Sequence, residues 1–499
     1  MPSQTTTRRL AAALCTGLLT VSLGAVAAQP AAAYAPDGAQ EQGAPGNSGN
    51  AGRPDSPGNS GNAGRPDSPG NSGNAGRPDS PGDSGNAGRP DSPGNSGNAG
   101  RPENPGKPDN PGRPGDGNDA DDGQCAFAPE GGRTAYEADR DSLRAHSDDD
   151  IRIGNVAAGG GHHSDEEYPD PFPDDADYRQ HLAEEYSSIT HENYLKWEFV
   201  HPEEGVFDFE AADAVVELAQ AHDMDVRGHA LSWHSQNPDW LEEGDHSPEE
   251  LREILEDHVR TVVSRYAGCI QQWDVANEIF GDDADASIRD DENIWIRELG
   301  VEILDDIFRW AHEEDPEALL FYNDYNVDGI NAKSDAYYDL VQEQLDRGVP
   351  VHGFGAQTHL SMQYGFDETY QDNLERFDAL GLHTAVTEID VRGEVDEGDR
   401  MSAADRAGAA ERFETVLQAC LDVDNCNSFT IWGTLDAHSW VPNTFPGEGD
   451  ATLHEGDYER KPTYCILQRT LVKHQEGAEV WSQDAAFEEC RGILEEAGV

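Results

Sequence analysis

The sequence predicts an α/β fold, a single closed (β/α)8 TIM barrel preceded by a disordered linker rich in Gly, Pro, Asn and Ser. Two observations carry this prediction. Short apolar runs alternate with amphipathic helical stretches eight times after about residue 133, which is typical of a closed parallel barrel rather than an open doubly wound sheet. No glycine-rich phosphate loop follows the first strand, which argues against a nucleotide-binding sheet.

The apolar pattern places the elements of this barrel. We expect strands at residues 151–156, 188–190, 225–229, 271–277, 319–324, 353–359, 384–389 and 428–432. We expect helices between them, for example at residues 209–222, 249–266, 293–312, 402–421 and 462–474. Ser247, Pro248 and Glu250 predict the start of the second of these helices, because they place a capping Ser, a Pro and an acidic residue in the order that helix starts favour.

The first 35 residues have the composition of a secretory signal peptide. Arg8 and Arg9 precede an apolar run rich in Ala, Gly and Ser, and small residues suited to cleavage follow. The run is too short for a membrane span, so we expect none. We expect secretion to the extracellular space, by the twin-arginine route that Arg8 and Arg9 suggest or by the general secretory route.

Residues 36–124 contain a repeated twelve-residue unit. GNSGNAGRPDSP begins at Gly46 and starts again, with small changes, at Gly58, Gly70, Gly82 and Gly94. No unit contains a large apolar side chain, so stacked repeats could not bury a core. We therefore expect a disordered linker over residues 36–124, and a single catalytic domain over residues 125–499.

The chain is strongly acidic. It has 34 Lys and Arg against 99 Asp and Glu, a net charge of −65, and most of this charge lies after the linker. Such a surface repels nucleic acid and anionic membranes, so we expect neither as a partner. Because the excess charge destabilises a compact state unless ions screen it, we interpret it as adaptation to high salt. The alternative is an acidic secreted protein that tolerates ordinary buffer.

Two carboxylates stand at the ends of predicted strands. Glu278 follows the strand at residues 271–277, and Glu388 closes the strand at residues 384–389. Glycoside hydrolysis needs such a pair, one carboxyl group to protonate the leaving oxygen and one carboxylate to attack or to activate water. The proton donor should have a raised pKa, while its partner stays ionised.

Polar and aromatic side chains follow the other strands, where a barrel gathers its active site. Asn, Gln, Lys and His can bind sugar hydroxyls, and Trp and Tyr can stack on sugar rings. Asn277 is placed to bind the sugar 2-hydroxyl, and His359 to orient Glu388 by a hydrogen bond. The full set is His191, Glu192, Asn193, Lys196, Trp197, His229, Trp233, His234, Gln236, Asn277, Glu278, Asn323, Asp324, Tyr325, Asn326, Gln357, Thr358, His359, Glu388, Trp432 and Trp440.

At these residues the chain resembles glycoside hydrolase family 10, the endo-β-1,4-xylanases. The matching blocks, in order, are THENYLKWE, RGHALSWHSQNPDW, WDVANE, YNDYN, GFGAQTHL, TEID, IWGTLDAHSW and KPTY. The resemblance implies a (β/α)8 barrel and retaining hydrolysis through a covalent glycosyl-enzyme. It implies that Glu278 is the acid/base and Glu388 the nucleophile, about 5 to 5.5 Å apart.

The resemblance also assigns the substrate contacts. It places Tyr325 on the leaving-group side. It assigns to the glycone side and the catalytic subsite Glu192, Asn193, Lys196, His229, Trp233, Gln236, Asn277, Gln357, His359, Trp432 and Trp440. Two loops depart from the family pattern, GGGHHSDEEYPDPFPDD after the first strand and residues 450–455 after the last, and both concern the outer subsites.

We expect no metal and no cofactor, because His162, His163 and His454 lack a fixed ligand spacing. We expect a monomer that acts on xylan or a related β-1,4-linked plant polysaccharide. The hydrolysis of internal xylosidic bonds is the leading function. A β-1,4-glucanase or a transglycosylase on the same barrel is an alternative, and so is a polysaccharide-binding surface protein without activity. Both glutamates, Asn277 and His359 argue against the last of these.

Seven cysteines include Cys15 in the signal peptide and leave six that suit disulfides in an oxidising compartment. The family resemblance implies a bridge between Cys420 and Cys426. Cys125 and Cys490 lie at the two ends of the domain, where barrel closure could bring them together. Cys269 and Cys465 would then remain, as a pair or as buried thiols.

Overall fold

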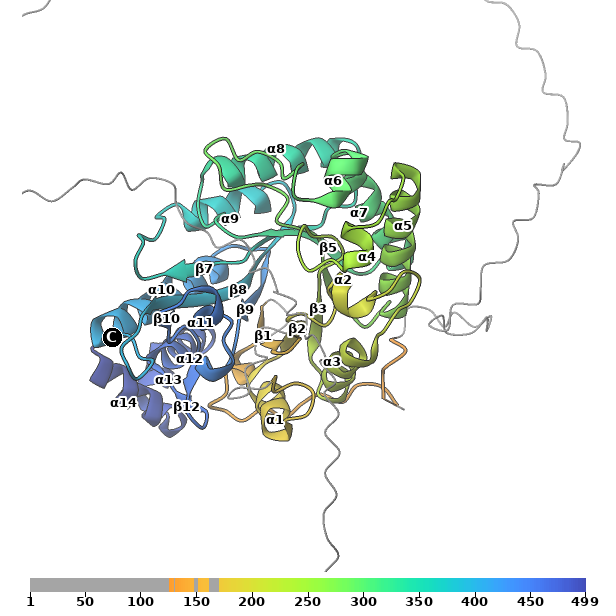
Figure 1. Cartoon of the computed structure of the whole chain (residues 1–499). Coiled ribbons are helices and arrows are strands. Elements are labelled where there is room, and N and C mark those ends of the chain that lie inside the picture. The colour runs from red at the N-terminus through yellow and green to blue at the C-terminus, as the bar shows by residue number, and fades with distance from the viewer. Residues whose placement is uncertain (1–124, 130, 148–150, 161–169) are drawn as a thin grey trace, which may run out of the picture. The chain divides into compact units, whose positions relative to one another are not determined.

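The computed structural model describes residues 125–129, 131–147, 151–160 and 170–499 (Figure 1). The predicted signal peptide at residues 1–35 and the predicted linker at residues 36–124 lie outside the described residues. So do His162 and His163.

Eight parallel strands form a closed barrel, which confirms the predicted fold (Figure 1). Neighbouring strands pair in chain order, and closure occurs because the last strand pairs with both the first and the preceding one, through Gly154↔Thr430 and Ile389↔Ile431. The strands are β1 (Arg152–Ala157), β2 (Ser188–His191), β3 (Asp225–His229), β4 (Gln272–Asn277), β5 (Leu319–Asp324), β6 (Gly353–Ala356), β8 (His383–Glu394) and β9 (Cys426–Ile431).

Helices surround the strands (Figure 1). They are α1 (Ala176–Glu185), α2 (Trp197–Val200), α3 (Glu210–Ala221), α4 (Asp239–Glu242), α5 (Pro248–Arg265), α6 (Ile294–Leu299), α7 (Ile303–Glu314), α8 (Ala332–Asp346), α9 (Tyr370–Asp378), α10 (Ala403–Leu421), α11 (Val441–Thr444), α12 (Pro462–Gln475), α13 (Ala478–Gln483) and α14 (Glu488–Ala497). The short strands outside the barrel are β7 (His359–Ser361), β10 (Glu448–Gly449), β11 (His454–Glu455) and β12 (Glu459–Arg460). In the described part of the chain no helix is long and apolar enough to cross a membrane.

Two predicted elements are divided in the structure. The predicted strand at residues 353–359 ends at Ala356, because Thr358 has a φ of 65° that a strand cannot hold, and β7 then pairs with the extended end of β8. The predicted helix at residues 293–312 breaks at Gly300, whose φ of 79° ends α6 before α7 begins. The predicted start of α5 is confirmed, since Ser247 and Glu250 form a reciprocal capping box.

The barrel interior contains a buried ion pair. Arg227 and His229 are two residues apart on β3 and therefore point to the same face. Both contact Asp274 on the neighbouring strand β4: the Arg227 guanidinium through two nitrogens, and His229 Nδ1 at 2.9 Å from Oδ2. The guanidinium also lies over the ring of Phe321, with its carbon 4.6 Å from the ring centroid. This pairing fixes the ring of His229 at the mouth of the barrel.

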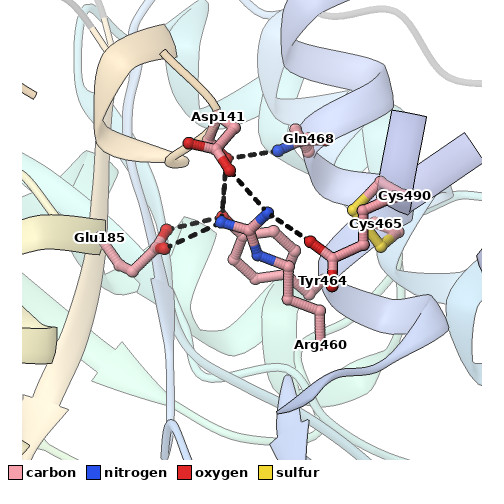
Figure 2. Close-up of a disulfide and its surroundings, with 8 residues drawn as sticks. Asp141, Glu185, Arg460, Tyr464, Cys465, Gln468 and Cys490 are labelled. Carbon is pink, nitrogen blue, oxygen red and sulfur yellow. Dashed lines mark hydrogen bonds and ion pairs between the residues drawn. A yellow bond between two sulfur atoms is a disulfide. The ribbon is translucent and has the colours of Figure 1, made fainter. Parts of the chain in front are cut away.

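The disulfides correct one prediction and confirm another. Cys420 and Cys426 are bridged, as the resemblance implied. The predicted approach of Cys125 to Cys490 is wrong, because Cys125 is bridged to Cys269, which precedes β4. Cys490 on α14 is instead bridged to Cys465 on α12, where these two C-terminal helices pack together (Figure 2).

An ion-pair cluster beside the last disulfide joins the two ends of the domain (Figure 2). Arg460 lies 3.0 Å from Asp141, 3.4 Å from Glu185 and 3.4 Å from Glu489. The Tyr464 hydroxyl donates to Glu185 at 2.6 Å. The segment before β1 is therefore held against α12 by charge as well as by packing.

Several buried histidines are kept neutral by the fold. His258 is fully buried, stacks on Trp197 with ring centroids 3.5 Å apart and faces His201. Burial lowers the pKa of His258 well below 6.5, and it lowers the pKa values of His191 and His201 to about 4. As the pH falls below 6.5, these rings stay neutral in the native state, whereas the same histidines in the unfolded chain begin to bind protons.

We expect this neutrality to make the fold sensitive to acid. The free energy of unfolding should be at its full value above pH 6.5 and should fall toward pH 4, by on the order of 3 kcal/mol for a histidine whose pKa moves from 6.5 to about 4. Calorimetry in about 3 M NaCl, which screens the carboxylate repulsion, measures this fall. His258→Phe keeps a stacked ring that cannot titrate, so the free energy of unfolding of this variant should fall less between pH 6.5 and pH 4. The exposed control His474→Gln should show the same fall as the wild-type protein. Equal falls in the two variants would contradict the prediction.

Candidate active site

The predicted site residues gather at the carboxyl ends of the barrel strands. Both glutamates are buried, with Glu278 9% and Glu388 4% exposed. The surrounding side chains are also mostly buried, which shields the two carboxylates from bulk water and strengthens their hydrogen bonds. The predicted residues that the structure buries are Glu192, Asn193, Lys196, His229, Asn277, Gln357 and Trp432, while Trp233, Gln236, Tyr325, His359 and Trp440 are partly buried.

Glu278 is held by donors from the segments that follow β3 and β6. Trp233 Nε1 donates to its Oε2 and Gln357 Nε2 donates to its Oε1, each at 2.9 Å. Its main-chain nitrogen donates to the carbonyl oxygen of Asn323 at 2.9 Å. Glu278 has a φ of 53°, a left-handed conformation that is uncommon outside glycine and asparagine and is found at functional sites. The strand end thus turns this carboxylate into the mouth of the barrel.

The charge state of Glu278 differs from the expected one. Burial alone would raise the pKa of Glu278, but His234, the hydrogen bonds from Gln357 and Trp233 and the Lys333 ammonium outweigh it and lower the pKa below 4.5. The prediction that this site by itself raises the pKa is therefore wrong for the unliganded site. Donors that a sequence pattern cannot place hold Glu278 ionised.

Glu388 is held by different partners. Asn323 Nδ2 donates to its Oε1 at 2.7 Å, and His359 Nε2 lies 3.3 Å from its Oε2. Thr387 Oγ1 in turn donates to Asn323 Oδ1 at 2.6 Å, which fixes the orientation of that amide. The structure therefore brings His359 to Glu388, as the proposed orienting role requires.

His359 is held between two carboxylates. Its Nδ1 lies 2.9 Å from Asp390 Oδ2, and Trp440 Nε1 donates to the same oxygen at 2.8 Å. Burial alone would lower the pKa of His359, but Asp390 and Glu388 raise it to about 10. The ring is thus an imidazolium at neutral pH, which places a positive charge 3.3 Å from Glu388.

Asn277 lies between the two glutamates. Its side chain is in contact with Asn323 in either orientation of its amide, and Trp233 Nε1 lies 3.2 Å from the atom that becomes its oxygen when the amide is turned. In the other orientation its nitrogen lies 3.3 Å from Glu278 Oε1. Asn277 therefore contacts the side chains that hold both glutamates, and its binding of the sugar 2-hydroxyl stays a prediction.

A polar cluster from β2 and β3 lines one side of the site. The Lys196 ammonium donates to Asn193 Oδ1 at 2.8 Å and to Gln236 Oε1 at 2.7 Å, and it lies 4.7 Å from the ring centroid of Trp233. Burial lowers the pKa of Lys196 despite nearby carboxylates, of which Glu388 has the largest influence. Amide groups and a partly desolvated ammonium beside an aromatic face can bind the hydroxyls and the flat side of a sugar.

Two tryptophans and two histidines form a second wall. Trp432 lies edge-on to His229, with ring centroids 5.5 Å apart, and the ring centroid of Trp440 is 4.9 Å from that of His359. Glu192 accepts from the main-chain nitrogen of Gly159 at 2.8 Å, which ties the end of β2 to the end of β1.

A model of the family described as Glycosyl hydrolase family 10 matches residues 155–469. The chain belongs to glycosyl hydrolase family 10. Endo-1,4-beta-xylanase B of Thermotoga neapolitana is 39% identical to it over 300 residues, which are 60% of this chain and 85% of that protein. Endo-1,4-beta-xylanase B of Paenibacillus barcinonensis is 40% identical over 279 residues, 54% of this chain and 82% of that protein.

A solved structure shares the architecture. Xylanase 10B from Thermotoga petrophila, solved in complex with xylobiose, superposes with a TM-score of 0.61 at 35% identity, and the match covers 68% of this chain and 99% of that one. Members of family 10 are retaining glycoside hydrolases, so this chain is a retaining glycoside hydrolase, as the sequence motifs predicted.

In this family 10 barrel, Tyr325 lies apart from the Lys196 cluster. Its hydroxyl donates to Asp282 Oδ2 at 2.5 Å and accepts from Arg289 Nη2 at 2.7 Å. Both partners come from the loop between β4 and α6, which also carries Glu278 at its start. Tyr325 is therefore fixed by the same loop that positions this glutamate.

Sequence reasoning gave no role to several residues that hold the site. Asp390 is two residues from Glu388 on β8, so strand alternation could have found it on the same face. Asn323 stood at a predicted strand end without an assigned partner. Asp274 and Asp282 gave no signal, because their partners come from other strands or from a loop whose path only the folded chain defines.

His454, one of the three histidines weighed as metal ligands, is a packing residue. It is buried against His181, with ring centroids 4.7 Å apart, and against Tyr464. Burial lowers its pKa well below 6.5. Within the described residues no group of three or more His, Cys, Asp and Glu side chains is arranged to hold a metal ion.

Replacing Asp390 by Asn should weaken catalysis and move its alkaline limit. The change removes the charge that raises the pKa of His359, so the imidazolium should be lost at lower pH and the alkaline limb of kcat/KM should shift toward neutrality. At the pH optimum we expect a loss of about ten-fold or more, since a buried hydrogen bond between charged groups is removed. The exposed control Glu397→Gln should leave the profile in place. An unchanged alkaline limb in Asp390→Asn would contradict the prediction.

Proposed function

We propose that this chain is a secreted endo-1,4-β-xylanase that hydrolyses internal β-1,4 bonds of xylan with retention, with Glu278 as acid/base and Glu388 as nucleophile. The observation that carries the proposal is the unequal surroundings of two carboxylates in one family 10 site. Glu388 accepts from the Asn323 amide at 2.7 Å and lies 3.3 Å from the His359 ring. Glu278 accepts from Trp233 and Gln357, each at 2.9 Å, and stands at the start of the loop whose Asp282 holds the Tyr325 hydroxyl.

In the first step, Glu388 attacks the anomeric carbon of the sugar on the Lys196 side. The glycosidic C–O bond breaks, its electron pair stays on the leaving oxygen, and Glu278 gives that oxygen a proton. Because Glu278 is ionised in the unliganded site, we infer that its proton is taken up as substrate binds. The substrate excludes water from the carboxylate, and desolvation favours its neutral form.

In the second step, water replaces the leaving group. Glu278, now a carboxylate, takes a proton from the water, whose oxygen bonds to the anomeric carbon as the ester bond to Glu388 breaks. Two inversions restore the original β configuration. Asn277 is placed to bind the 2-hydroxyl, a contact that strengthens in the transition state.

Xylan is the substrate that the relatives favour. The proteins named above are called endo-1,4-beta-xylanases, and the Thermotoga petrophila structure contains xylobiose. Discrimination against glucan would depend on whether a hydroxymethyl group fits beside Lys196, Trp432 and Trp440.

Azide rescue of two alanine variants tests the assignment of roles. Glu278→Ala and Glu388→Ala should each lower kcat on xylan by roughly 10⁴-fold or more. With a 2,4-dinitrophenyl β-xylobioside, azide should rescue Glu278→Ala and give the β-glycosyl azide, because the nucleophile remains. With the same donor, azide should rescue Glu388→Ala and give the α-glycosyl azide, because azide then attacks the anomeric carbon directly and inverts it once.

Exchanged stereochemistry in the two variants would reverse the roles, and wild-type enzyme that leaves xylan intact in salt would refute the xylanase proposal. Cleavage of β-1,4-glucan in place of xylan would support the glucanase alternative. Binding of either polymer without release of reducing ends would support a non-catalytic binding protein.

We also propose that the enzyme is adapted to high salt. Cations are scarce and shared: Arg260 contacts Glu256, Glu313 and Glu314 within 2.9 Å. Carboxylates elsewhere face one another, as do the exposed Glu253 and Asp257, one turn apart on α5. Like charges at this spacing destabilise a helix unless ions screen them.

The salt proposal predicts a higher melting temperature as NaCl rises from about 0.1 M to 3 M, at which the screening length falls to a few Å. Sucrose at matched viscosity is the uncharged control and should not reproduce the full rise. The double change Glu253→Gln with Asp257→Asn should raise the melting temperature at low salt more than at high salt. A chain as stable and active in dilute buffer as in molar salt would refute this proposal.

Secretion is proposed on the composition of residues 1–35 and on three disulfides, which persist in oxidising compartments. Recovery of enzyme from culture medium with a new N-terminus after the apolar run would support it. Recovery with the intact leader from the cell interior would refute it.

A further inference from the structure

A charged cluster surrounds Tyr325 beside the proton donor. It consists of Asp282 and Arg289 on the loop between β4 and α6, Asn326 after β5, and Lys333 near the start of α8. Asp282 Oδ1 accepts from Asn326 Nδ2 at 3.0 Å and from the Lys333 ammonium at 3.1 Å. Its Oδ2 accepts from the Tyr325 hydroxyl. One carboxylate therefore accepts from two other segments of the chain, the loop after β5 and helix α8.

The cluster leaves Tyr325 little freedom. Its hydroxyl is held by Asp282 as acceptor and by Arg289 as donor, so the ring cannot rotate away. The Lys333 ammonium lies 3.9 Å from the ring centroid, and Lys333 is only 5% exposed because it is also bound to Asp324 at 2.8 Å. Tyr325 itself is partly exposed. The accessible part of the ring is thus the part that faces away from Lys333.

The charges of this cluster act on Glu278. Lys333 contributes to the lowered pKa of Glu278, and Glu278 raises the pKa of Arg289. On the opposite side of the site, Lys196 is influenced first by Glu388 among its carboxylates. The tyrosine lies on the Glu278 side of the site, because Asp282 and Arg289, which hold its hydroxyl, belong to the loop that begins at Glu278.

We propose that Asp282 is a positioning residue that fixes Tyr325 as a platform for the sugar that leaves. This inference rests on the proposed function. A xylopyranose ring presents flat C–H faces that stack on an aromatic ring held in one orientation. The same place would receive a sugar that attacks the glycosyl-enzyme instead of water. Asp282 thus sets how often the enzyme transfers to sugar and how often it transfers to water.

The test measures the ratio of transfer to a sugar acceptor over hydrolysis. The donor is 2,4-dinitrophenyl β-xylobioside, whose leaving group needs no sugar platform, and xylobiose is added as acceptor. In Asp282→Ala the ratio of transfer to hydrolysis should fall about ten-fold, since the loss of hydrogen bonds to a charged group frees the ring. The value of kcat/KM for xylotetraose should fall by a similar factor, while kcat on the aryl donor alone stays within about two-fold.

Two further variants and a control sharpen the test. Asp282→Asn keeps an acceptor for the hydroxyl but loses the ion pairs with Lys333 at 3.1 Å and with Arg289 at 3.4 Å, so its ratio should lie between those of wild type and Asp282→Ala. Tyr325→Phe keeps the ring and loses its anchor, and it should follow Asp282→Ala. Asp335→Asn on the same helix as Lys333 removes an exposed ion pair with Arg376 and should change neither readout. Rates are compared at the pH optimum of each variant.

The ratio is a property of active molecules, so partial unfolding of a variant does not alter it. An unchanged ratio in Asp282→Ala, or equal losses on the aryl donor and on xylotetraose, would assign Asp282 to stability alone and overturn the inference. Wild-type enzyme that cleaves neither substrate would refute the proposed function, and the inference with it. If the wild-type enzyme is active and the ratio of transfer to hydrolysis is the same in the variants, only the inference about Asp282 is refuted.

Discussion

The site depends on Asn323, which contacts both glutamates from the end of β5. Its carbonyl oxygen accepts from the main-chain nitrogen of Glu278, and its amide donates to the side chain of Glu388 at 2.7 Å. Thr387 fixes the amide from β8. Asn323 thus joins the end of β4 through its main-chain oxygen and β8 through its side chain. Loss of this buried amide would leave its partners without a hydrogen bond.

The two glutamates receive different kinds of support. Glu388 lies beside the imidazolium that Asp390 maintains, while Glu278 accepts hydrogen bonds from the neutral nitrogens of Trp233 and Gln357. His234, whose Nδ1 lies 3.9 Å from Glu278 Oε2, and Lys333 also lower the pKa of Glu278, so basic side chains influence both carboxylates. The acid/base must exchange a proton twice in each turnover, whereas the nucleophile must stay ionised until it attacks.

Three of the few basic side chains of this acidic chain connect separate elements of the fold. Arg227 lies inside the barrel with Asp274, Lys461 is buried between Asp436 and Asp450, and Arg460 joins the segment before β1 to the C-terminal helices. Buried ion pairs are costly to break, since the remaining charge stays desolvated. The exposed carboxylates carry the net charge, while these three basic residues pair with carboxylates whose positions the fold fixes.

The sequence by itself determined the barrel and the family, and it nominated the residues that the structure gathers at one end of the strands. Strand and helix periods are local, so β3 and β5 were predicted to the residue, and polar residues at strand ends such as Glu278 and Glu388 had to converge once the barrel closed. Only the tertiary structure decided features that need two distant segments. Cys125 meets Cys269 because of the path of the N-terminal segment. The pKa of Glu278 depends on donors from other strands, and Tyr325 is fixed by a loop carrying Asp282. Each of these is a long-range contact, which no local pattern specifies.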